Sequence, residues 1–148
     1  MTRKDVLGGL LVCAAIVALD LASKAIVQSE VPRGDVVRVL PFLDIVNSRN
    51  DGIAFGLAGG VSPALIGAAL VVLLGLVAYL GSKAHSGWAV WVPAGVLIGG
   101  AIANLIDRVV RGSVVDFIDF SFWPAFNLAD VAIVVGVGLL VLAPMRDP

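Results

Sequence analysis

Reactive and charged side chains are scarce in this sequence of 148 residues. It has one cysteine, Cys13, and one histidine, His85, so it can form no internal disulfide and offers no Cys/His cluster for zinc. Charged residues make up only 14% of the chain, and their net charge of −1 gives no reason to expect nucleic-acid binding. These shortages exclude a disulfide-stabilised domain, a zinc-stabilised domain and a nucleic-acid-binding protein.

Apolar residues, in contrast, make up 59% of the chain, more than a soluble fold of this length could bury. The length is that of one domain, residues 1–148. Apolar runs of about the length needed to cross a ~30 Å hydrocarbon core fall at about 6–27, 62–81, 88–109 and 128–144. The sequence therefore predicts an all-α integral membrane protein with four transmembrane helices. Within the third run, Gly99 and Gly100 are typical of close helix packing.

The first apolar run has a second interpretation, a cleaved signal peptide, because it follows Arg3 and Lys4 and has small residues at Ala22 and Ser23. Its apolar stretch continues to Val27, which favours a retained span. Basic residues before a first span usually remain in the cytoplasm. We therefore expect both termini in the cytoplasm, and the ends of the first and third spans, with the start of the fourth, on the extracytoplasmic side.

Two segments between the spans differ in composition from the helices. Residues 28–61 alternate apolar and charged side chains, which predicts a small extracytoplasmic β element. Residues 110–126 end in a cluster of Phe and Trp, which predicts a short interfacial loop lying on the bilayer. We expect residues 28–61 and 117–126 to close together over a ligand from the extracytoplasmic side.

Polar residues within the apolar runs gather on three helix faces. Their spacings are i, i+3, i+4 and i+7, so each set shares one face. The sets are Asp20, Ser23 and Lys24; Asn104, Asp107, Arg108 and Arg111; and Asn127 and Asp130. Any one set could be a group of headgroup-reaching side chains, and the first could be a structural Asp20–Lys24 ion pair. Three faces converging on one membrane surface favour a functional site.

Asp116 and Asp130 are the strongest candidates for chemistry in that site. Each has apolar neighbours, and an ionised carboxylate at membrane depth costs about 2.5–3.5 kcal/mol or more. Two such groups close together favour one protonated and one ionised carboxyl, the chemistry of an aspartic protease. A Ser23–Lys24 dyad is a weaker alternative, because adjacent helical side chains point about 100° apart. The residues leave open which aspartate carries the proton, and no metal or organic cofactor is needed.

Five motifs in order resemble lipoprotein signal peptidase (signal peptidase II), the aspartic peptidase of bacterial membranes. They are Asp20-Leu-Ala-Ser-Lys24, Asn50-Asp-Gly-Ile-Ala-Phe55, Gly99-Gly-Ala-Ile-Ala-Asn-Leu-Ile-Asp-Arg108, Val115-Asp-Phe117 and Phe126-Asn-Leu-Ala-Asp130. The resemblance covers nearly the whole chain. The loop between the two aspartates looks short for the family, and Asp51 and Ile53 stand where the family often has other residues.

The resemblance implies an activity and a set of roles. The family cuts signal peptides from diacylglyceryl-modified prolipoproteins, just before the lipidated cysteine, in the bacterial cytoplasmic membrane. Prolipoproteins and membrane lipids would be the partners, with the active site on the extracytoplasmic side. By resemblance, Asp116 and Asp130 match the catalytic pair. The supporting or substrate-binding positions match Asp20, Asn50, Asn104, Arg108 and Asn127.

Two other classes of function remain as alternatives. A proton-coupled transporter or channel component also uses intramembrane carboxylates, but it predicts polar residues along the full depth of several helices. A non-catalytic scaffold would tolerate replacement of Asp116 or Asp130 by Asn.

Overall fold

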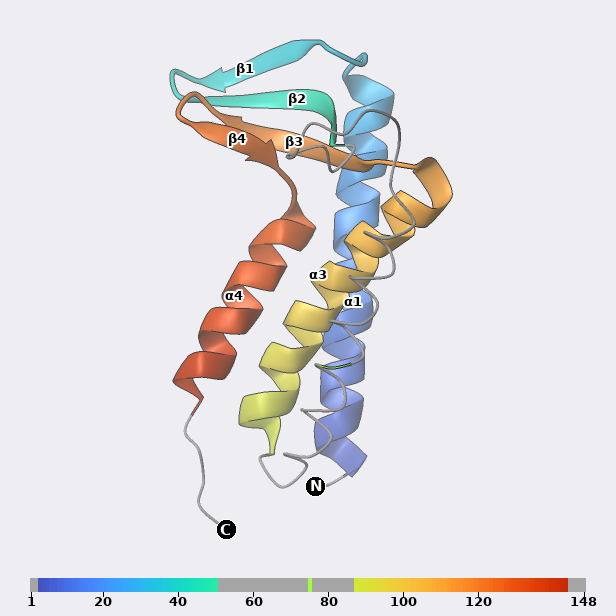
Figure 1. The fold of residues 1–148 in the computed structure, drawn as a ribbon, viewed down its shortest axis with the longest axis vertical. Coiled ribbons are helices and arrows are strands. Elements are labelled where there is room, and N and C mark those ends of the chain that lie inside the picture. Colours follow the sequence, from blue (N-terminus) through green and yellow to red (C-terminus); the bar gives the residue numbers. More distant parts are fainter. Residues whose placement is uncertain (1–2, 51–74, 76–86, 144–148) are drawn as a thin grey trace.

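The computed structural model describes residues 3–50, 75 and 87–143. Three helices run side by side, and a small sheet lies across one end of them, opposite the N-terminus (Figure 1). In chain order the elements are α1 (Arg3–Glu30), β1 (Val36–Leu40), β2 (Leu43–Asn50), α3 (Trp88–Arg111), β3 (Val114–Phe120), β4 (Trp123–Phe126) and α4 (Leu128–Leu142).

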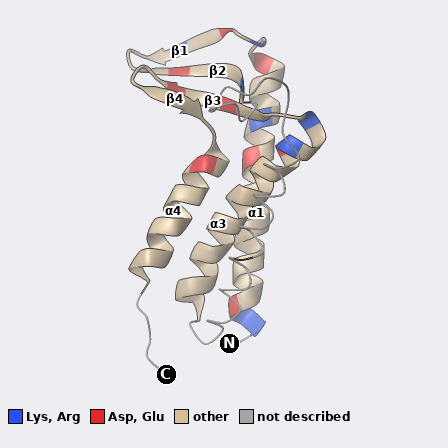
Figure 2. Ribbon diagram, in the orientation of Figure 1, with Lys and Arg blue, Asp and Glu red and all other residues tan. Residues whose placement is uncertain are grey.

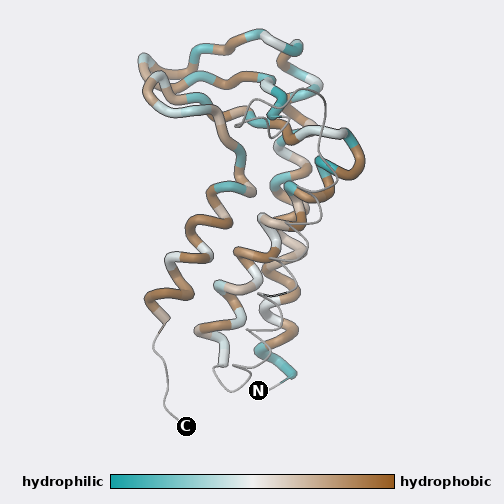
Figure 3. The backbone as a smooth tube through the Cα atoms, viewed as in Figure 1, coloured by the Kyte–Doolittle hydropathy of each residue, from teal (hydrophilic) through white to brown (hydrophobic). Residues whose placement is uncertain are grey.

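Two of these helices, α1 and α3, are long and apolar enough to cross a membrane, and α4 is a shorter apolar helix. Large apolar side chains such as Leu10, Leu11 and Val141 are exposed along them, and the helices are mostly hydrophobic in Figure 3. These surfaces suit lipid rather than water. The predicted spans at 6–27, 88–109 and 128–144 thus correspond to helices, whereas the predicted span at 62–81 lies outside the described residues.

Glycines let the three helices approach closely. A Cβ on Gly95 would fall on the carbonyl oxygen of Gly9 in α1, and one on Gly99 would lie 2.9 Å from the carbonyl oxygen of Cys13. Gly100 meets the backbone of Ala129 in α4 in the same way. The backbones of α1 and α4 therefore pack directly against α3, as small residues allow in membranes.

The four strands form one antiparallel sheet in the order β1-β2-β3-β4. In β2 and β3, Ser48 lies opposite Asp116 and Asn50 lies opposite Val114. Val27 near the end of α1 and Val31 just after it form a small core with Phe117 of β3. This core attaches the sheet to the end of the helices.

The prediction that residues 110–126 form an interfacial loop was wrong. Helix α3 continues to Arg111 and ends at Gly112, whose φ of 74° closes the helix with an N–H bond to the carbonyl of Arg108. Strands β3 and β4 follow, because the β-branched and aromatic residues from Val114 onward pair with β2. Residues 36–50 and 114–126 belong to the same sheet. Closure of the two segments over a ligand stays a prediction.

We expect Gly95→Ala to destabilise the protein by about 1–3 kcal/mol, because the new methyl group would overlap the backbone of Gly9. Thermal unfolding in detergent micelles would measure the change. Gly8→Ala is the matched control in α1, since no atom lies within 4 Å of its added Cβ. Equal melting temperatures for the two variants would contradict the packing described here.

Candidate active site

Asp116 lies in the middle of β3 with only 3% of its surface exposed. Two asparagine amides donate hydrogen bonds to its carboxyl group. Asn50, at the end of β2, donates to Oδ2 at 2.9 Å, and Asn127, between β4 and α4, donates to Oδ1 at 2.6 Å. The pairing of β2 with β3 therefore delivers one donor, and the start of α4 delivers the other.

Asp130 lies in the first turn of α4, where its carboxyl group takes part in a capping box. Its Oδ2 accepts the backbone N–H of Asn127 at 3.2 Å, and its own N–H donates to Oδ1 of Asn127 at 3.0 Å. Asn104 of α3 donates to the other oxygen, Oδ1, at 2.8 Å. Two N–H donors therefore point at the carboxyl group of Asp130, which lies at the N-terminus of α4.

Asn127 connects the two aspartates. It is fully buried, and its amide faces Asp116 on one side and the backbone of Asp130 on the other. The carboxyl groups lie close enough for the charge of Asp130 to act on Asp116. The structure thus brings together the two residues that the sequence singled out, through one shared side chain.

Burial raises the pKa of Asp116 above its ordinary value. The hydrogen bonds from Asn50 and Asn127 oppose that rise, the negative charge of Asp130 adds to it, and the positive charge of Lys24 opposes it. Of the two carboxyl groups, Asp116 is the one whose surroundings favour keeping a proton, because it is buried while Asp130 is partly exposed.

A buried ion cluster lies beside this pair. Lys24 of α1 is fully buried, and its ammonium lies 2.6 Å from Asp20 and 2.8 Å from Asp107 of α3. It also donates to Oδ1 of Asn104 at 3.0 Å. Arg111 forms a second ion pair with Asp107. Sequence spacing predicted the Asp20–Lys24 pair, but not that Lys24 and Asp107 join across two helices.

The same cluster holds the backbone near both aspartates. Asp20 accepts the N–H of Ala129, the residue before Asp130, at 2.8 Å. Asp107 accepts the N–H of Val115, the residue before Asp116, at 3.5 Å. Asp20, Asn50, Asn104 and Asn127 therefore all lie at the predicted site.

The remaining candidates have other contacts. The guanidinium group of Arg108 donates to the main-chain carbonyl of Asn104 at 3.4 Å, which places it next to the site rather than on a carboxylate. The hydroxyl of Ser23 donates to the main-chain carbonyl of Asp20 at 2.8 Å. Because acidic groups hold the Lys24 ammonium, no Ser23–Lys24 dyad is assembled.

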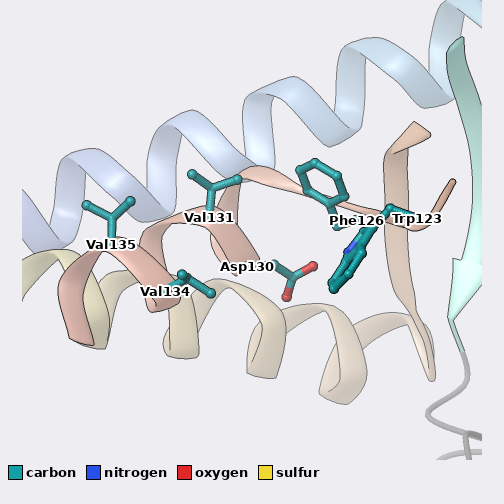
Figure 4. A pocket seen from close by; sticks show the side chains of 6 residues that line it. All are labelled: Trp123, Phe126, Asp130, Val131, Val134 and Val135. Carbon is teal, nitrogen blue, oxygen red and sulfur yellow. The ribbon is translucent and has the colours of Figure 1, made fainter. Parts of the chain in front are cut away.

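An apolar pocket of about 250 Å³ opens beside Asp130. Its walls are Trp123 and Phe126 from β4 and Val131, Val134 and Val135 from α4. Figure 4 shows the carboxylate of Asp130 pointing toward the ring of Trp123, between the strand and the helix. Within residues 3–50, 75 and 87–143, no three His, Cys, Asp or Glu side chains gather as metal ligands. The arrangement suits acid–base chemistry on a partly apolar molecule.

The chain is similar to proteins of a known family over most of its length. A family model described as signal peptidase (SPase) II matches residues 12–146. The lipoprotein signal peptidase of Desulfitobacterium hafniense (strain Y51) is 40% identical over 132 residues, which are 88% of this chain and 87% of that protein. That of Staphylococcus aureus (strain MRSA252) is 33% identical over 153 residues, covering 99% and 94% of the two chains.

The fold is similar to that of a solved bacterial membrane enzyme, determined by the in meso method at 1.9 Å resolution. The TM-score is 0.82 at 32% identity, and the match covers 95% of this chain and 94% of the other.

Asp116 should make the stability of the folded protein depend on pH. Its raised pKa means that the folded state holds the proton more tightly than the unfolded chain, so this contribution is complete at low pH and is lost as pH rises. We expect Asp116→Asn to become more stable relative to the wild type as pH increases from 4 to 8.

Thermal unfolding in detergent micelles across that range measures the effect. Asp119→Asn, which removes a carboxyl group from the same strand, is the control, and the gain for Asp116→Asn should exceed it. A stability difference that shrinks with rising pH would contradict the burial described here.

Proposed function

The chain belongs to the signal peptidase II family, and on that premise we propose that it removes signal peptides from diacylglyceryl-modified prolipoproteins as an aspartic endopeptidase. The observation that carries the proposal is the position of the buried Asn127 next to an apolar pocket: its side-chain amide donates to the carboxyl group of Asp116, and its backbone N–H donates to that of Asp130. Cleavage would fall before the lipidated cysteine.

In the proposed reaction, Asp130 is the ionised base and Asp116 the acid. Asp130 takes a proton from water, and the oxygen of that water attacks the scissile carbonyl carbon. Asp116 donates its proton to the carbonyl oxygen. When the tetrahedral intermediate collapses, the C–N bond breaks and the leaving nitrogen takes a proton from Asp130. One hydroxyl of the intermediate returns a proton to Asp116, and the new carboxyl product forms. The contacts that support these roles are the donors around Asp130 at the helix N-terminus and the burial of Asp116.

The surroundings of the pair fit a lipidated peptide. The pocket beside Asp130 is lined by apolar and aromatic side chains, and it opens next to helix surfaces suited to lipid. We infer that an apolar part of the substrate occupies it, while the acyl chains remain in the bilayer. A peptide arriving within the membrane would then reach Asp130 without crossing water.

We also propose that the protein lies in the bacterial cytoplasmic membrane, with both termini in the cytoplasm and the catalytic pair on the extracytoplasmic side. Residues 62–81 would supply the fourth span. Arg3 and Lys4 lie at the end of α1 that is opposite the sheet, as Figure 2 illustrates. This polarity supports the orientation, because basic residues next to a first span favour the cytoplasmic side.

A proton-coupled transporter is not favoured by the described residues. The buried charged groups of α1 and α3 are Asp20, Lys24 and Asp107, and all three join one cluster at the sheet end of the helices. A proton relay would require such groups through the depth of the membrane.

Asp116→Asn and Asp130→Asn should each lower kcat by about 10²–10⁴-fold or more, because each removes one partner of the acid–base pair. The assay incubates purified protein with a diacylated prolipoprotein and follows the shortened product by mass spectrometry. Asp119→Asn, on the same strand as Asp116, is the matched control and should cleave normally. Turnover at the wild-type rate in either Asp116 or Asp130 variant would refute the pair.

Val135→Phe should raise KM for the lipidated substrate about tenfold, because the larger ring fills the pocket. Steady-state cleavage kinetics would measure it. Val141→Phe makes the same substitution on the exposed surface near the end of α4 and is the control. If both variants have the same KM, the pocket does not receive the substrate.

A further inference from the structure

We propose that Lys24 is a positioning residue for the Asp116–Asp130 pair, because its ammonium holds the Asn104 amide in the one orientation that presents an N–H donor to Asp130. The proposal rests on the proposed function, in which Asp130 acts as the ionised base. The contacts of the Lys24 ammonium are with Asp20, Asp107 and Asn104 rather than with Asp116 or Asp130. Lys24 would nevertheless affect the protonation of the Asp116–Asp130 pair.

The chemistry of the contact carries the argument. An ammonium group has only donors, so the Asn104 atom that faces it must be the carbonyl oxygen. The NH₂ end of the amide then faces Oδ1 of Asp130. The other oxygen of Asp130 already accepts the backbone N–H of Asn127. If the amide turned over, its carbonyl would face Asp130, and this contact would suit only the protonated form.

Lys24 can perform this role because its charge is held in place. Its side chain is fully buried, and Asp20 and Asp107 accept from it on two sides. Asp107 also pairs with Arg111, so the cluster has two cations and two anions. Such pairing keeps a buried lysine charged, and removal of one partner leaves the others uncompensated.

Among the residues that the structure describes, the charged groups around the pair come from four elements. They are Asp20 and Lys24 of α1, Asp107, Arg108 and Arg111 of α3, Asp116 of β3 and Asp130 of α4. Lys24 has two effects on this set: its charge lowers the pKa of Asp116, and its hold on Asn104 favours the carboxylate form of Asp130. Both effects favour ionisation, so loss of Lys24 should move activity to higher pH.

The test uses a charge-balanced variant of the full chain. Lys24→Met alone would leave Asp20 unpaired, so Lys24→Met is combined with Asp20→Asn, whose amide oxygen can still accept the N–H of Ala129. Asp20→Asn alone is the comparator. We expect the acidic limb of the pH–rate profile to lie about one pH unit higher in the double variant, the scale of one hydrogen bond to a charged group. An unshifted limb overturns the proposal.

Asn104→Ala separates positioning from a simple charge effect. It removes the donor to Asp130 but retains Lys24 and its acidic partners, so it should shift the acidic limb in the same direction. In the Asn104→Ala background, the shift caused by the Lys24 and Asp20 changes should fall to less than half. A full shift in that background means that Lys24 acts through its charge alone, and the positioning role is then wrong. If the Lys24 variant does not fold, an unshifted limb in Asn104→Ala alone overturns the proposal, because the Asn104 donor is the route by which Lys24 would act.

Failure of the proposed function can be distinguished from failure of the role proposed for Lys24. Carboxyl ¹³C NMR of aspartate-labelled protein in detergent micelles follows titration of the pair without any turnover, and Asp116→Asn and Asp130→Asn identify the two signals. If the wild type does not cleave a prolipoprotein, the proposed function fails, yet the titration of the pair should still move to higher pH in the Lys24 variant. An identical titration in both proteins overturns the role of Lys24, whether or not the peptide is cut.

Discussion

The structure depends on the burial of one positive charge, that of Lys24. A buried ammonium is costly unless it is paired and hydrogen-bonded, so the pairing decides how the helices meet. Asp20 supplies the partner from α1, and Asp107 supplies it from α3. The same two carboxylates bind the N–H groups of Ala129 and Val115, which precede the two candidate catalytic residues. A single ion cluster thus fixes the helices, the start of α4 and the start of β3.

The sheet brings hydrogen-bond donors to Asp116 from two sides. A carboxyl group on a strand can receive donors from the next strand and from the following helix, and Asp116 receives both, from Asn50 and Asn127. Asp116 is buried, whereas Asp130 stays partly exposed beside a pocket. Two carboxyl groups so close together therefore have different surroundings, which is the condition for an acid and a base to coexist at one pH.

Sequence reasoning predicted α1, α3 and α4, and it singled out two aspartates and several polar residues that the structure brings together. It succeeded where the spacing within one helix places two residues together, as for Asp20 with Lys24. It also succeeded where a charged residue, which is costly to bury in a membrane, has apolar neighbours in the sequence, as for Asp116. It missed Lys24 and Asp107 as a pair, because helical spacing says nothing about partners on another helix. It also mistook β3 and β4 for a loop, because Phe and Trp favour strands as well as membrane interfaces.

The charge balance of the cluster bears on how the pair keeps one proton. Lys24 and Arg111 offset Asp20 and Asp107, so the cluster presents little net charge to its surroundings. A cluster with excess positive charge would favour ionisation of both Asp116 and Asp130, and the acid would be lost. A cluster with excess negative charge would favour protonation of both, and the base would be lost. In the proposed mechanism a nearly neutral cluster acts mainly by orientation, because it aims the Asn104 amide and holds the backbone on either side. The charge of Lys24 adds a smaller effect, since it opposes the rise that burial causes in the pKa of Asp116.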